Sequence, residues 1–160
     1  MMVIRLDGVE LERQWDANDT FNDFEVAYPL FAGNGAEQMT VFYWVIQSGC
    51  LVGFHTDSAE EVLLVVTGKI AVSDGAEVVT VTEGQLLYLP RLTTHELRNI
   101  GEKEARCLSF LPSSNVAVWF AAPLQPWGLQ YIRTGDLPLA QAPQGKESAV
   151  YTPTIGSPSS

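Results

Sequence analysis

The stretch GCLVGFHTDSAEEVLLVVTG, from Gly49 to Gly68, decides the fold class and carries most of the residues to which a function can be tied. His55 and Asp57 lie two residues apart, so on a β-strand both side chains leave the same face. Glu61 follows a short polar break and begins a second apolar run, which allows a returning strand to bring its carboxylate to that face. An imidazole and carboxylates that converge on one point are typical ligands of a divalent transition metal.

The composition is that of one folded domain: 160 residues, of which 46% are hydrophobic and 18% are charged. The formal net charge of -10 repels phosphate backbones and anionic membranes, so we expect neither nucleic acid nor a membrane as partner. No apolar run is long enough to span a bilayer, and the N-terminus lacks the apolar segment of a secretory signal. We therefore expect a cytoplasmic protein in which Cys50 and Cys107 are small core residues rather than a redox pair.

Many short strands with frequent turn signals are predicted in the middle of the chain, and no segment of this region shows the 3.6-residue period of an amphipathic helix. This pattern indicates an all-β sandwich or barrel. The expected strands cover residues 39–47, 51–57, 61–66, 69–73, 77–82, 86–89, 95–100 and 105–111.

The sequence divides into three regions. Residues 1–34 are expected to form an N-terminal arm and an edge strand at 24–31, because Pro29 cannot donate a hydrogen bond to a neighbouring strand. Residues 35–112 are expected to form the barrel core. Residues 113–160 are expected to hold a further strand, a loop and an extended tail rich in Pro, Gly and Ser.

The opening stretch resembles the first sequence motif of the cupin superfamily. That motif is Gly, five residues, His, one residue, His, three or four residues, Glu, six residues and Gly. This chain keeps the spacing at every step, with Gly49, His55, Asp57, Glu61 and Gly68.

A second segment resembles the second cupin motif, which is Gly, five residues, Pro, one residue, Gly, two residues, His, three residues and Asn. The matching residues are Gly84, Pro90, Leu92, His95 and Asn99. The resemblance covers roughly residues 39–112, and it implies an all-β fold, a cupin-type jelly-roll β-barrel. It also implies a homodimer, since cupins frequently pair through strands outside the barrel.

Two positions depart from the family pattern: Asp57 stands where the second histidine is usual, and Leu92 where a glycine is usual. The resemblance implies His55, Glu61 and His95 as metal ligands. Asp57 is then either a fourth ligand or a group that orients His55 or a bound water. One divalent transition metal is implied; the carboxylates favour Fe(II) or Mn(II), and Zn or Ni would also fit.

Several neighbouring residues have weaker claims to a role. Glu60 points to the strand face opposite to Glu61, so we expect it in solvent. Tyr43, Tyr88 and Arg98 are candidate substrate contacts, although packing outside the cavity or exposure on the surface would explain them equally well.

Two functions of different classes remain open. The first is a mononuclear metal enzyme that acts on a small organic molecule, with dioxygenase-like chemistry favoured and metal-dependent isomerase or decarboxylase chemistry as an alternative. The second is a non-catalytic cupin that binds a small molecule. The motifs alone do not choose a substrate, because one fold hosts many chemistries.

Overall fold

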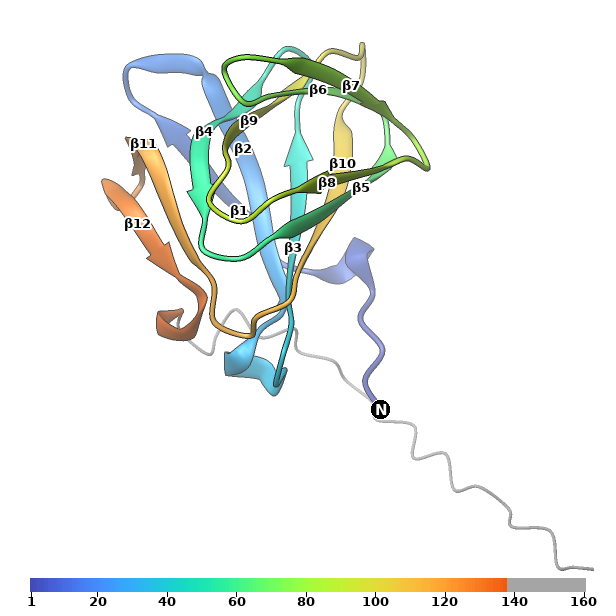
Figure 1. Ribbon diagram of the computed structural model, residues 1–160, viewed down its shortest axis with the longest axis vertical. Helices are drawn as coiled ribbons and strands as arrows, with labels where there is room; N and C mark the ends of the chain where they lie inside the picture. Colours follow the sequence, from blue (N-terminus) through green and yellow to red (C-terminus); the bar gives the residue numbers. More distant parts are fainter. Residues whose placement is uncertain (138–160) are drawn as a thin grey trace, which may run out of the picture.

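Short antiparallel strands make up most of the protein, as the alternating sequence pattern predicts. The computed structural model describes residues 1–137, which contain these strands and three short 3-10 helices (Figure 1). The strands are β1 (Glu12–Asp16), β2 (Asp19–Leu30), β3 (Thr40–Ile46), β4 (Leu51–Asp57), β5 (Glu61–Thr67), β6 (Lys69–Ser73), β7 (Val78–Thr82), β8 (Leu86–Leu89), β9 (Thr94–Asn99), β10 (Ala105–Leu111), β11 (Ala117–Gln125) and β12 (Leu129–Arg133). The 3-10 helices are η1 (Leu6–Gly8), η2 (Ala32–Asn34) and η3 (Thr134–Asp136).

The strands form a continuous sheet that curves into a barrel (Figure 1). Hydrogen bonds link them in the order β7–β6–β9–β4–β11–β1–β2–β3–β10–β5–β8, and β12 pairs with β11. The two halves of this path share one core, in which Val52 and Leu97 come from one half and Phe42 and Leu63 from the other. The predicted all-β barrel is confirmed.

Strand β3 is buried along its whole length because both of its faces are covered. Phe42 and Trp44 point into the barrel core, where their rings meet edge to face with centroids 5.4 Å apart. Tyr43 and Val45 leave the opposite face and pack against the N-terminal arm, which includes Leu6. The arm therefore covers the outer face of β3.

The N-terminal region contributes more to the sheet than the sequence suggested. The expected edge strand is wrong, because β2 lies between β1 and β3. Pro29 is tolerated there because the β2–β3 pairing shifts register between Ala27 and Leu30, where no ladder hydrogen bond is required of it. The preceding Asn/Asp cluster forms the β1–β2 turn, in which Asp16 Oδ1 accepts a hydrogen bond from the Asn18 backbone N–H at 2.8 Å.

The sheet also extends beyond residue 112. Strand β11 pairs with both β1 and β4, and β12 adds to its free edge. The predicted tail lies mostly outside the described residues, which end at Leu137. Within residues 1–137, no helix is long and apolar enough to cross a membrane.

Candidate metal centre

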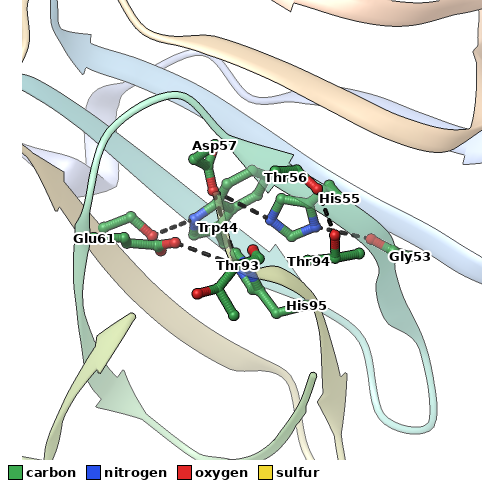
Figure 2. A network of polar contacts seen from close by, with 10 residues as sticks. Trp44, Gly53, His55, Thr56, Asp57, Glu61, Thr93, Thr94 and His95 are labelled. Atoms are coloured by element: carbon green, nitrogen blue, oxygen red, sulfur yellow. Dashed lines mark hydrogen bonds and ion pairs between the residues drawn. The ribbon is translucent and has the colours of Figure 1, made fainter. Parts of the chain in front are cut away.

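The site begins with a pair of histidines on adjacent strands. His55 in β4 stands directly opposite His95 in β9 in the antiparallel register, and the two ring centroids are 4.2 Å apart. Asp57 follows His55 by two residues, so its side chain leaves β4 on the same face. Figure 2 shows the three side chains converging inside the barrel.

These three residues form a group of suitable size for one metal ion. One ligand atom from each of His55, Asp57 and His95 lies within 4.8 Å of the other two. Asp57 Oδ2 is 3.9 Å from the Nε2 atom of each histidine. All three residues are buried, with exposed fractions of 2%, 4% and 1%.

The backbone fixes the orientation of both rings. His55 Nδ1 lies 2.8 Å from the Gly53 carbonyl oxygen, and His95 Nδ1 lies 3.0 Å from that of Thr93. Because a carbonyl only accepts, Nδ1 carries a hydrogen in each ring. The neutral His55 ring keeps the lone pair of Nε2 for a cation, whereas His95 Nε2 faces the Glu61 carboxylate, which raises the pKa of this ring, so a metal would have to displace a proton there.

Glu61, at the start of β5, lies beside this group rather than within it. Its Oε2 atom is 3.3 Å from His95 Nε2, and the side chain is buried. Figure 2 shows it entering from the side opposite to His55. The cupin pattern put Glu61 among the main ligands and left Asp57 open, whereas the geometry groups Asp57 with both histidines.

Burial and mutual charge separate the pKa values of the four groups. Burial, helped by the neighbouring His95, lowers the pKa of His55 to about 3, so this ring is neutral near pH 7. Burial and the charge of Glu61 raise the pKa of Asp57 well above its usual value. For Glu61 and His95, burial opposes ionisation, but their contact outweighs it: the pKa of Glu61 is lowered and that of His95 is raised.

The donor set fits a divalent cation. Asp57 Oδ1 is buried without a hydrogen-bond partner, and Glu61 Oε2 and His95 Nε2 are buried and face each other at 3.3 Å without a well-directed hydrogen bond. Unpaired polar atoms of this kind are costly inside a protein, and a bound cation would satisfy them together. Two imidazoles with carboxylate oxygens suit first-row metals such as Fe(II), Mn(II), Zn and Ni.

Sequence reasoning did not find the residues that support these ligands. Gly53 and Thr93 each precede their histidine by two positions, and this shared spacing was the only local signal for them. Ser109 is a single hydroxyl in the apolar strand β10; it accepts a hydrogen bond from Trp44 Nε1 at 2.7 Å and lowers the pKa of Glu61.

The three candidate substrate contacts do not join the cluster. Tyr43 faces the N-terminal arm, and its hydroxyl accepts a hydrogen bond from Arg106 at 3.0 Å. Tyr88 is 57% exposed and donates to Glu60 Oε2, so both lie on the outer surface. Arg98 is half-buried and alternates with the inward-facing residues of β9. Their role in substrate binding stays a prediction.

Comparison with known proteins agrees with this architecture. A cupin domain model matches residues 42–111. An uncharacterized protein of Streptomyces coelicolor is 30% identical over 112 residues, which cover 70% of this chain and 97% of that protein.

Solved structures with the same fold are more distant in sequence. The polyketide cyclase RemF from Streptomyces resistomycificus is 17% identical with a TM-score of 0.59, over 70% of this chain and 79% of that one. A cupin-like protein from Thermotoga maritima is 17% identical with a TM-score of 0.52, over 62% of this chain and 77% of that one. A mutant of oxalate decarboxylase from Bacillus subtilis is 14% identical with a TM-score of 0.54, over 67% of this chain and 30% of that one. With both sequence motifs, the barrel and the family match in agreement, the chain belongs to the cupin superfamily.

Proposed function

We propose that this cupin holds one divalent metal through His55, Asp57 and His95 and acts on a small organic molecule as a dioxygenase-like oxidoreductase. The observation that supports this most directly is the buried set of two imidazoles and one carboxylate. This donor set is typical of non-haem Fe(II) oxygenases, and it leaves coordination positions free for other ligands. Fe(II) or Mn(II) is the favoured ion.

When bound, such an ion supplies Lewis acidity toward a substrate oxygen and redox reactivity toward dioxygen. The chain's own residues have separate tasks. The carbonyls of Gly53 and Thr93 hold the two rings in the tautomer that ligation requires. Glu61, whose pKa is lowered, is ionised near neutral pH and can accept a proton from a substrate hydroxyl at Oε2. A metal-dependent isomerase or decarboxylase would use the same groups.

One observation favours the second candidate, a non-catalytic barrel that binds a small molecule. His55, Asp57, Glu61 and His95 are each exposed by less than a twentieth of their surface. A metal enclosed to this degree would stabilise the barrel, and a substrate would need an opening motion to reach it. The two candidates therefore differ in turnover, not in metal content.

The test combines elemental analysis with oxygen uptake. The protein, purified without chelator, is compared with His95→Ala and with the control Glu96→Ala, which removes the adjacent outward-facing side chain of β9. We expect near-stoichiometric iron or manganese in the parent and the control, and loss of most of it in His95→Ala. Phenolic and diketone compounds then serve as substrates in the oxygen electrode.

The outcomes separate the candidates. Metal-dependent oxygen uptake that His95→Ala abolishes would support the oxidoreductase. Stoichiometric metal without oxygen uptake would support isomerase or decarboxylase chemistry, or the binding barrel. Equal metal content in the parent and His95→Ala would disprove the ligand assignment.

A further inference from the structure

A cavity lies away from the metal-ligand group, between the β1–β2 hairpin and the C-terminal strand β12. Its volume is about 340 Å³, which is within the range of small-molecule sites. None of its lining residues falls within the segment 42–111 that matches the cupin model. This cavity is therefore built by the parts of the chain that surround the family core.

Most of the cavity wall is formed by apolar and aromatic side chains. Trp127, Leu129 and Tyr131 line it and remain 50%, 47% and 44% exposed, so each offers a face to a ligand. Tyr28 lines the deeper part and is only 5% exposed; its ring contacts Phe42 of the core edge to face at 5.3 Å. A flat ring is the shape that such walls would cover best.

One polar group in the wall has no well-formed hydrogen bond. Gln14 lines the cavity and is only 1% exposed; it interacts with the neighbouring Tyr28 hydroxyl, but neither its amide nitrogen nor its amide oxygen makes a hydrogen bond of good geometry. A buried amide that satisfies neither its donor nor its acceptor is uncommon in native proteins. A ligand with an acceptor next to a donor would satisfy both amide atoms at once.

We propose that this cavity binds a flat, uncharged ring compound with an N–H next to a carbonyl, that is, a lactam or an aromatic carboxamide. Gln14 Nε2 donates to the ligand carbonyl, and Gln14 Oε1 accepts from the ligand N–H. The ring lies against Trp127 and Tyr131. An uncharged ligand fits because the charged residues that line the cavity, Glu12, Arg133 and Asp136, carry both signs.

This site is independent of the proposed metal chemistry. His55, Asp57 and His95 do not line the cavity. We therefore expect the same affinity in metal-free and metal-loaded protein, so failure of either proposal leaves the other testable.

The probe is 2-quinolinone, a bicyclic lactam, titrated into the full chain by calorimetry. Its N-methyl derivative keeps the ring and the carbonyl but removes the donor. We expect the lactam to bind at least about tenfold more tightly than the N-methyl compound. The N-methyl compound cannot donate a hydrogen bond to Gln14 Oε1, and its methyl group would also collide with that oxygen.

Three variants test which residues contact the ligand. Gln14→Leu should reduce the affinity for the lactam about tenfold or more and bring the two compounds close to equal. Trp127→Ala should weaken both compounds, since it removes ring contact. Phe21→Ala, an equally exposed aromatic on β2 that does not line the cavity, should change neither affinity.

The comparison of the two compounds on the parent protein decides the question even if Gln14→Leu does not fold. Equal binding of the lactam and the N-methyl compound, or no binding of the lactam at millimolar concentration, would overturn the proposal. An unchanged lactam affinity in a folded Gln14→Leu protein would do the same.

Discussion

Asp57 occupies the position at which the first cupin motif usually has a histidine, yet it remains part of the cluster. Its place two residues after His55 keeps it on the inward face of β4, and its Oδ2 atom is 3.9 Å from both Nε2 atoms. In the proposed site, this exchange would replace a neutral imidazole ligand with a carboxylate. A carboxylate is the better ligand for a hard divalent ion, and the strand conformation stays the same.

Amide substitutions distinguish the roles of the carboxylates. Asp57→Asn keeps the size of the side chain but removes its charge, so we expect metal affinity to fall by about 10–100-fold. Glu61→Gln should cost less, because Glu61 lies outside the group of three. Competition with a chromophoric chelator measures both.

Glu60→Gln is the matched control for these variants, because Glu60 is exposed and bonds Tyr88 on the outer surface. It should bind metal as the parent does. A larger loss in Glu61→Gln than in Asp57→Asn would instead make Glu61 the main carboxylate ligand.

The buried thiol of Cys107 should react slowly in the native protein. Cys50 and Cys107 are both free thiols, and burial together with the charge of Glu61 raises the pKa of Cys107 to about 12. A raised thiol pKa reduces the reactive thiolate, to about one part in ten thousand at pH 8. In a Cys50→Ser background, we expect Ellman's reagent to react with Cys107 at least about 100-fold more slowly in the native protein than in urea. Equal rates would show that the core opens readily.

Among the elements, the β5–β6 turn depends on one glycine. Gly68 has a φ of 91°, a left-handed conformation that disfavours side chains, and an added Cβ would lie 3.0 Å from Ala105 Cα. Gly75, in the β6–β7 turn, has a φ of 89° but no atom within 4 Å of an added Cβ. The two positions thus share a backbone conformation and differ in packing.

Gly75→Ala should destabilise the protein by about 1 kcal/mol, from the conformation alone. Gly68→Ala should cost about 1–3 kcal/mol more, because the β10 backbone must also move. Urea unfolding of both variants measures the difference. Equal losses would mean that the β5–β10 contact adapts without strain.

The end of β9 is held by a motif residue with a structural task. Asn99 is 1% exposed; its amide nitrogen donates to the carbonyls of Ile46 at 2.7 Å and Lys103 at 2.8 Å, and its oxygen accepts from the Gly101 N–H. The cupin pattern contains this position, but here it joins β9 to the end of β3 and to the following turn.

Asn99→Ala should therefore destabilise the fold by about 2–4 kcal/mol, since it leaves buried backbone groups unpaired. Metal affinity of the folded fraction should not change. Thermal unfolding and chelator competition on the same sample check both statements; a loss of affinity without a loss of stability would contradict this assignment.

At the scale of the whole molecule, the metal and the barrel should stabilise each other. Four buried ionisable groups come from three strands, β4, β5 and β9, and several of their atoms lack partners. A ligand that binds only the folded state adds about 2.7 kcal/mol of stability at a hundredfold excess over its Kd.

We expect Mn(II) at such an excess to raise the Tm by roughly 5–10 °C for a domain of this size. The increase should disappear in His95→Ala and persist in Glu96→Ala. Scanning calorimetry of metal-free protein with and without Mn(II) makes the measurement. An equal shift in His95→Ala would mean that the ion binds elsewhere.

The sequence by itself determined the central strands and the family. The alternation of side chains along a strand is a local property, so 51–57, 69–73 and 105–111 were predicted with the bounds that the structure has. The same alternation predicted that His55 and Asp57 share one face of their strand. It also predicted that Glu60 points away from the face that carries Glu61. The motif spacing added His95, although it lies far away in the chain.

Tertiary structure alone decided what depends on pairing between distant segments. The β4–β9 register sets His55 opposite His95, which brings Asp57 within 3.9 Å of both rings, whereas Glu61 contacts only His95, at 3.3 Å. Strands β1 and β12 have weak local patterns and exist because β2 and β11 offer them an edge. Those contacts also build the cavity around Gln14. Strand partners and buried polar contacts are non-local, and no property of one segment specifies them.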